Sequence, residues 1–191
     1  IDPPKRSIAV VALTAEEKGL IGADYFARFP PMPKSAIAAN VNLDMTIMLH
    51  EFTDVIAFGA ERSTLGDAVK PAASRAGVAL SPDPFPEQGI FARSDHFRFV
   101  QQGVPSVYLF PGFQNGGEAL FRAFMAERYH RPNDDLSQPI RYDDAARFAD
   151  LNADIVRAIA NDPGRPRWRE GDFFGDLFAD RNDADLSDSV D

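Results

Sequence analysis

Short apolar runs alternate along this chain with longer segments in which apolar positions recur every three or four residues. Strands are predicted for the apolar runs, at 7–13, 36–44, 54–59, 78–80 and 105–110. Helices are predicted for the periodic segments, at 17–28, 64–76, 94–102, 118–126 and 143–160. Strands that alternate with helices are typical of an α/β domain. We therefore predict a mixed, mostly parallel sheet flanked by helices on both faces.

Composition indicates one globular domain with an acidic extension. Apolar residues make up 45% of the 191 positions, which is enough for one sizeable core. We predict that residues 1–161 form this domain and that residues 162–191 form the extension. The extension carries nine acidic residues and four arginines, so its net charge of −5 is more than half of the chain's net charge of −9. Its apolar part, 166–178, is expected to dock on the domain or on a partner, and 180–191 to be disordered.

The same composition excludes several kinds of site and partner. The chain has no cysteine, so disulfides and thiolate-bound metals are excluded, and a metal ion would need histidine and carboxylate ligands. No cluster of Lys and Arg with interleaved aromatic residues is present, so no nucleic-acid partner is expected. The apolar runs are far shorter than the roughly 18 residues of a membrane span, so no membrane partner is expected either.

The pair Glu16-Glu17 follows the first predicted strand, at the point where a helix is predicted to begin. The carboxyl ends of strands are where open α/β sheets place their chemistry. Two adjacent acids there could divide two tasks, with one binding a cation and the other moving a proton. The alternative is a capping box, in which Thr14 and Glu17 satisfy the first N–H groups of the helix. On these residues alone the capping box is the commoner pattern.

Asp44 and His130 are the other candidate metal ligands. Asp44 ends the strand predicted at 36–44, and His130 lies in the long connection at 112–135. Together with the glutamate pair they would supply the oxygen and nitrogen ligands that zinc accepts. The alternatives are an ordinary turn residue for Asp44 and a loop histidine bonded to Asp134 for His130. Spacing does not decide between these interpretations.

Two other patterns fail as catalytic motifs. In Ser94-Asp95-His96 the side chains are consecutive, so they diverge and cannot form a serine-hydrolase relay among themselves. His50-Glu51 lacks the second histidine that a zinc-protease helix motif needs four residues after the first.

Five ordered motifs resemble the M28 family of zinc aminopeptidases and their carboxypeptidase-like relatives. They are Ile8 to Gly22, Asn42-Leu43-Asp44-Met45, Arg93-Ser94-Asp95-His96-Phe97, Gly103-Val104-Pro105 and Tyr129-His130-Arg131-Pro132-Asn133-Asp134. The similarity spans about residues 7–160. It implies a zinc-exopeptidase-like fold, a peptide substrate and hydrolysis by a metal-activated water. By the same resemblance the protein would be periplasmic or secreted.

The resemblance also assigns roles to residues. It implies that Glu16 is the general base and that Glu17 and His130 bind one of two zinc ions. Asp44 would bind the other zinc ion, and Tyr129 would donate a hydrogen bond to the tetrahedral oxyanion. The remaining assignments are to the substrate pocket, which Ser94, Asp95 and His96 would line.

The chain departs from the family in one respect. Two further ligands, a histidine in a His-x-Asp motif and a bridging aspartate, normally precede the Glu-Glu strand, and this chain has no residues there. We therefore expect the N-terminal part of the catalytic domain to be missing and the chain to be inactive as it stands. An exposed sheet edge would then be able to pair with another copy. The alternatives are a non-catalytic relative that binds peptides or partners and a glutaminyl-cyclase-like acyltransferase on the same scaffold.

Overall fold

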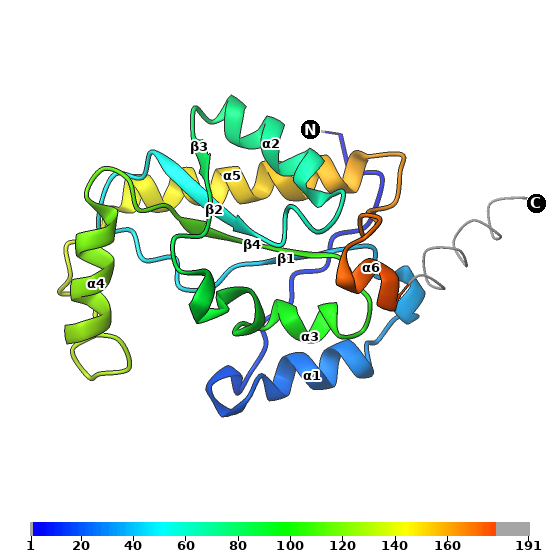
Figure 1. The fold of residues 1–191 in the computed structure, drawn as a ribbon, viewed down its shortest axis with the longest axis horizontal. Coiled ribbons are helices and arrows are strands. Elements are labelled where there is room, and N and C mark those ends of the chain that lie inside the picture. Colours follow the sequence, from blue (N-terminus) through cyan, green and yellow to red (C-terminus); the bar gives the residue numbers. More distant parts are fainter. Residues whose placement is uncertain (1, 179–191) are drawn as a thin grey trace, which may run out of the picture.

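A mixed sheet forms the centre of the computed structural model, which describes residues 2–178 (Figure 1). Its strands are β1 (Asn40–Asn42), β2 (Asp54–Phe58), β3 (Ala79–Ser81) and β4 (Ser106–Pro111). They lie in the order β1-β4-β2-β3. The pairs β1–β4 and β2–β3 are parallel, whereas β2 and β4 are antiparallel. The predicted mixed, mostly parallel sheet is thus confirmed.

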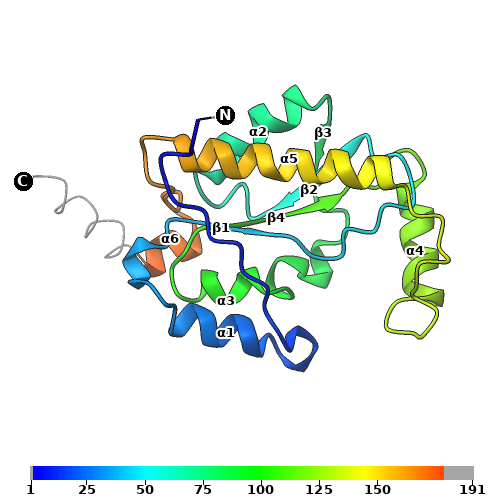
Figure 2. The same cartoon turned by 180° about the vertical axis from the view of Figure 1, so that it is seen from behind.

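Helices cover both faces of this sheet. They are α1 (Ile21–Arg28), α2 (Leu65–Arg75), α3 (His96–Val100), α4 (Gly117–Glu127), α5 (Tyr142–Asn161) and α6 (Phe173–Leu177). Helices α2 and α5 pack together on one face, and α1 and α3 lie on the other (Figures 1 and 2). Helix α4 stands at one end of the sheet. No helix in the described part of the chain is both long and apolar enough to cross a membrane.

The core forms because successive strand residues face opposite sides of the sheet. Val55 and Leu109 point to one side, where they pack with Phe148 of α5 in the larger hydrophobic cluster. Ile56 and Tyr108, their neighbours along the strands, point to the other side and belong to a second cluster. Strands β2 and β4 are therefore buried on both faces, and β4 holds β1, the strand that precedes Asp44, by parallel pairing.

The strand predicted at 7–13 is not formed. The segment runs extended without a place in the described sheet, and Val10 is 96% and Ile8 48% exposed. In Figure 2 it is the blue ribbon without an arrow between the N-terminus and α1. An extended segment becomes a strand only when a neighbour completes its hydrogen bonds, and the described residues offer none here. Whether this side of the sheet pairs with another copy stays a prediction.

Candidate active site

The two glutamates lie on a tight turn. Residues Glu16–Lys18 form one turn of 3-10 helix, and Ala15 before it has a left-handed backbone with φ of 57°. Helix α1 begins only at Ile21, and no side chain caps either helix start. The capping-box interpretation is therefore wrong, because the left-handed residue before the turn directs the chain away from cap geometry. Neither carboxylate is used in capping.

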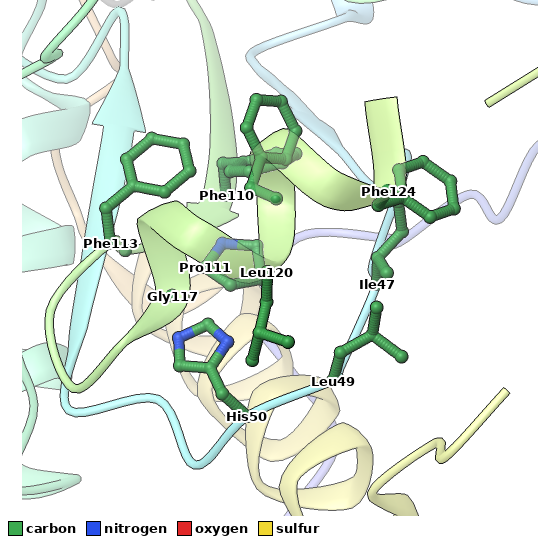
Figure 3. A pocket seen from close by; sticks show the side chains of 11 residues that line it. Ile47, Leu49, His50, Phe110, Pro111, Phe113, Gly117, Leu120 and Phe124 are labelled. Carbon is green, nitrogen blue, oxygen red and sulfur yellow. The ribbon is translucent and has the colours of Figure 1, made fainter. Parts of the chain in front are cut away.

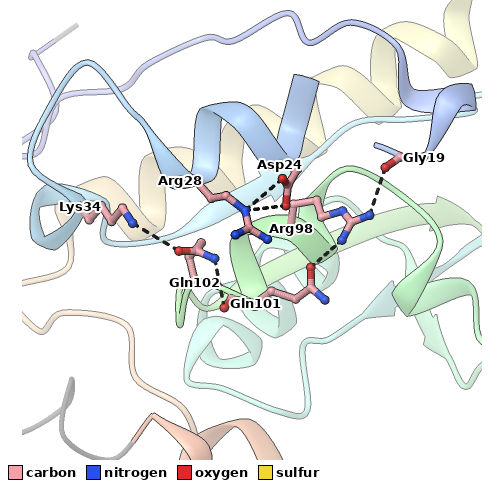
Figure 4. A network of polar contacts seen from close by, with 7 residues as sticks. All are labelled: Gly19, Asp24, Arg28, Lys34, Arg98, Gln101 and Gln102. Carbon is pink, nitrogen blue, oxygen red and sulfur yellow. Dashed lines mark hydrogen bonds and ion pairs between the residues drawn. The ribbon is translucent and has the colours of Figure 1, made fainter. Parts of the chain in front are cut away.

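The carbonyl of Gly19 anchors this turn to the rest of the fold. A guanidinium N–H of Arg98, on α3, donates to that carbonyl at 3.0 Å (Figure 4). Arg98 is held in turn by Gln101, whose side-chain oxygen accepts a hydrogen bond at 2.9 Å. A nearby ion pair between Arg28 and Asp24 stays within α1 and is exposed, so it adds little. The Arg98 bond thus fixes where Glu16 and its neighbour lie.

His130 and Glu17 are in contact although 113 positions separate them. The imidazole Nε2 of His130 lies 2.5 Å from Oε1 of Glu17. His130 has a left-handed backbone with φ of 57°, and the ring of Tyr129 stacks on it with centroids 3.7 Å apart. Both side chains of the pair are more than half exposed, so the pair lies at the surface and is open to solvent.

Asp44 is held by a chain of hydrogen bonds. The hydroxyl of Ser94 donates to its Oδ2 at 2.7 Å, and the amide of Asn42 donates to that hydroxyl at 2.8 Å. The Tyr108 hydroxyl donates to the Asp44 carbonyl at 3.1 Å. Ser94 is buried, so it acts on Asp44 from inside the fold. The structure thus places Ser94 behind Asp44.

The four carboxylates of Glu16, Glu17, Asp44 and Asp95 share this region, as the raised pKa values of Glu16 and Asp95 indicate. Burial raises the pKa of Glu16, and the nearby negative charges of Glu17, Asp44 and Asp95 raise it further. Burial and the charge of Asp44 likewise raise the pKa of Asp95. Burial, followed by the charge of Glu17, raises the pKa of the Tyr129 hydroxyl, so it stays protonated. The arrangement is a negatively charged surface that attracts cations and holds two carboxylates with raised pKa values, of which Glu16 lies next to the Glu17–His130 pair.

A zinc ion needs four ligands, commonly histidine, carboxylate and water. Glu17, His130 and Asp44 have suitable donor atoms, but Glu17 and His130 bond to each other. Nowhere in residues 2–178 do three or more His, Asp or Glu side chains gather in a way that could hold a metal ion. These residues alone therefore do not complete a zinc site, and any zinc bound here needs further ligands.

His96 lies apart from the other two residues of its motif. It is fully buried, with its ring 5.1 Å from that of Phe91 and 5.4 Å from that of Tyr108. Burial lowers the pKa of His96 to about 4, so the imidazole is neutral. Ser94 points to Asp44 while His96 points into the core, so the three consecutive residues form no relay.

A small cavity lies beside the site, between α4 and the end of β4 (Figure 3). Its volume of about 20 Å³ has room for a single water molecule. Phe110, Leu120, Phe124 and the imidazole of His50 line it, and Nε2 of His50 is buried without a hydrogen-bond partner among the described residues. The cavity is too small for a substrate side chain.

Residues 1–156 match the sequence pattern described as Peptidase family M28. The chain belongs to the M28 peptidase family. The match includes every residue of the candidate site, from the glutamate pair to His130. No curated protein sequence matches the chain.

Solved structures of aminopeptidases share the fold of this M28 peptidase. An aminopeptidase from Aneurinibacillus sp. strain AM-1 is 25% identical and has a TM-score of 0.56, and the match covers 80% of this chain and 33% of that one. BSAP, a zinc aminopeptidase from Bacillus subtilis, is 19% identical with a TM-score of 0.56, and the match covers 81% of this chain and 38% of that one. The chain thus spans about a third of the length of these relatives.

Two residues that support the site of this M28 peptidase were not predicted as part of it. Asn42 lies two positions before Asp44 and so projects to the same side of the extended chain. That spacing is a signal from which its role could have been inferred. Tyr108 lies on β4, which pairs with β1, and no sequence pattern links it to Asp44.

Replacing Ser94 by alanine should destabilise the M28 peptidase. Asn42 and Asp44 would both lose a hydrogen bond in a half-buried place, so the free energy of unfolding should fall by about 1–3 kcal/mol. Urea unfolding measures the change. Ser74→Ala is the matched control, because Ser74 is exposed on α2 and its loss should cost no more than about 0.5 kcal/mol. Equal effects of the two substitutions would contradict the role given to Ser94.

The neutral state of His96 predicts a pH dependence of stability. The folded protein takes up this proton only near pH 4, whereas an unfolded histidine takes it up near its ordinary pKa of 6.5. Protonation therefore favours the unfolded state as the pH falls from about 6.5 to 4, at a cost of about 3 kcal/mol. Relative to His96→Gln, the unmodified protein should lose this much between pH 7 and 4. Parallel stability curves for the two proteins would contradict the assignment.

Proposed function

We propose that this M28 peptidase chain carries the proton-transfer residue and part of the metal ligands of an aminopeptidase, which removes residues from the N-terminus of peptides. The observation that supports this most is the contact between His130 and Glu17 directly beside Glu16. An imidazole and a carboxylate are ordinary zinc ligands, and an adjacent carboxylate with a raised pKa suits a general base. The glutamate pair and His130 thus come together from two distant parts of the chain.

Each residue then has a chemical task. Glu16 takes the proton from the attacking water and passes it to the departing amine. The hydroxyl of Tyr129, which stays protonated, donates a hydrogen bond to the developing oxyanion. The negative charge of Asp44 and Asp95 attracts the ammonium group of a free N-terminus, which favours exopeptidase over endopeptidase activity.

Zinc chemistry needs ligands beyond those that the described residues bring together. Glu17, His130 and Asp44 would each contribute one donor group. A zinc ion, when bound, would lower the pKa of a water molecule and polarise the carbonyl of the substrate. We propose that the remaining ligands come from polypeptide other than residues 2–178, or from a second copy.

The incomplete ligand set also favours a second candidate function. A relative that binds peptides without cleaving them would keep the acidic surface and would not need a complete zinc site. Such a protein would recognise a free N-terminus through the same carboxylates.

A substrate panel with added zinc tests the proposal. It consists of aminoacyl-anilides, the same anilides with an acetylated N-terminus, and peptides that begin with glutamine. In a preparation where further polypeptide or a second copy supplies the remaining ligands, we expect zinc-dependent hydrolysis of the free anilides, no hydrolysis of the acetylated ones, and loss of activity with a chelator. Cyclisation of the glutamine peptides with release of ammonia would instead indicate an acyltransferase. Binding of free peptides without turnover of any substrate would support the non-catalytic function.

A further inference from the structure

The C-terminal segment, residues 165–177, packs against a turn that carries part of the candidate site. This turn comprises residues 89–97 and includes Ser94 and Asp95. The segment lies beyond residues 1–156, which match the M28 family, so the family match does not account for it. We infer that the C-terminal segment positions the 89–97 turn and thereby fixes the residues that hold and surround Asp44.

The first part of the segment is fastened by its backbone. Trp168 pairs with Ser63 in an isolated antiparallel bridge, and the N–H of Arg169 donates to the Arg62 carbonyl at 2.9 Å. The indole of Trp168 is buried, and its Nε1 donates to the carbonyl of Gly103 at 3.1 Å. Gly103 lies in the connection between α3 and β4. The indole therefore joins the segment to the two loops at this end of the sheet.

Aromatic rings carry the contact onward to the turn. The ring of Phe174, on α6, lies 5.3 Å from that of Trp168, 6.2 Å from that of Phe91 and 6.3 Å from that of Phe97. Phe91 in turn lies 5.1 Å from the ring of His96. Centroid distances of this size are those of interacting aromatic pairs. Phe174 therefore touches the 89–97 turn on both sides of Ser94 and Asp95.

A charged group also takes part in the contact between α6 and the 89–97 turn. The guanidinium of Arg62 lies 5.2 Å from the centre of the Phe91 ring and 5.6 Å from that of Phe174. It also pairs with the carboxylate of Asp172 at 3.0 Å. Asp172 accepts a hydrogen bond from the N–H of Phe174, which caps α6. Arg62 thus links the start of α6 to the ring of the turn.

The stretch that leads into the 89–97 turn is exposed, and the turn itself is held by Phe91, Ser94 and His96. Residues Pro86–Gln88 and Ile90–Ala92 are single turns of 3-10 helix, and positions 86–89, 92 and 93 are all exposed. Isolated turns with exposed backbone open easily, because little buried surface opposes the opening. Phe91, held between Phe174 and Arg62, is the apolar anchor in the middle of this stretch. Figures 1 and 2 both show α6 beside the layer that contains α3.

Amide hydrogen exchange of the 191-residue chain, read by mass spectrometry, tests the inference without relying on catalytic activity. We expect Phe174→Ala to speed exchange of peptides covering the 89–97 turn by about tenfold or more. Exchange in β2 and α5 should not change. Phe174→Leu should restore most of the protection, because it keeps an apolar side chain on Phe91.

Leu177→Ala is the matched control. Leu177 lies on the same helix and is 59% exposed, so its loss should leave the turn unchanged, whereas the ring of Phe173 lies 5.2 Å from that of Phe174. Arg62→Met provides a second test if Phe174→Ala does not fold, because it removes the charge over both rings and keeps the side-chain length. Faster exchange confined to the turn in either variant supports the inference. Unchanged exchange of the turn, or equal acceleration throughout β2 and α5, would overturn it.

Discussion

Replacing Glu16 by glutamine is expected to lower kcat for aminoacyl-anilides by about 10²–10⁴-fold in a zinc-loaded, active preparation of the protein. The reason is that glutamine cannot accept the proton of the attacking water, although it has the same size. Zinc content should stay the same, because the contact with His130 belongs to Glu17. Steady-state kinetics and metal analysis of the same samples measure both quantities.

Two further variants make this test specific. Glu17→Gln should lower both zinc content and turnover, because a carboxylate in contact with His130 is lost. Glu87→Gln changes an exposed glutamate on the 3-10 turn Pro86–Gln88 and should have no effect. Equal metal loss in Glu16→Gln and Glu17→Gln would show that Glu16 is a ligand, and the assignment of Glu16 as the base would then be wrong.

Replacing His130 by alanine should weaken zinc binding by at least about 100-fold. Loss of a residue that only hydrogen-bonds to a metal ligand weakens binding by about 10–100-fold, and the loss of a ligand should exceed that. The imidazole is the nitrogen donor in contact with Glu17, and the other histidines lie elsewhere. His96 is buried in the core and His50 lines the small cavity beside α4. Calorimetric titration with zinc measures the affinity.

His50→Ala is the control for this measurement. It removes an imidazole of the same kind that lies outside the glutamate pair, so zinc affinity should change by less than about twofold. A loss of affinity in His50→Ala as large as that in His130→Ala would contradict the placement of the zinc ligands.

Most of the fold could be predicted because its strands and helices have clear apolar periodicity. The helix at 64–76 and the strand at 54–59 are present almost as predicted. The strand at 7–13 has an equally clear apolar run and is not formed. A segment forms a strand only when a neighbouring strand completes its hydrogen bonds. The apolar pattern indicates that a segment tends to be buried, but it does not indicate whether such a neighbouring strand is present.

The candidate site could be predicted only in part. The glutamate pair and His130 were selected by motif, and the structure brings Glu17 and His130 into contact. The motif gave Ser94 a place in the substrate pocket, whereas in the structure Ser94 bonds to Asp44 across 50 positions. A hydrogen bond between remote side chains depends on the register of β1 and on where the 89–97 turn lies. The spacing of residues along the chain predicts neither that register nor the position of the turn.

The sequence also does not predict which residues the C-terminal segment contacts. The apolar residues of 166–178 predict burial, but they do not say against what. The partners include Arg62 and Phe91, which lie in two separate connections, and Phe97, which lies on α3. Residues 179–191, which include the stretch expected to be disordered, lie outside the described part of the chain.

The proposed function requires the carboxylate of Glu17 and the imidazole of His130 to be zinc ligands beside a base at Glu16. A crystal of the protein grown with zinc, with diffraction data collected at the zinc absorption edge, tests it most directly. We expect an anomalous peak about 2.0–2.2 Å from a carboxylate oxygen of Glu17 and a ring nitrogen of His130, with Glu16 next to it and not bound. A strongest peak at His50 or elsewhere, or no peak between Glu17 and His130, would contradict it.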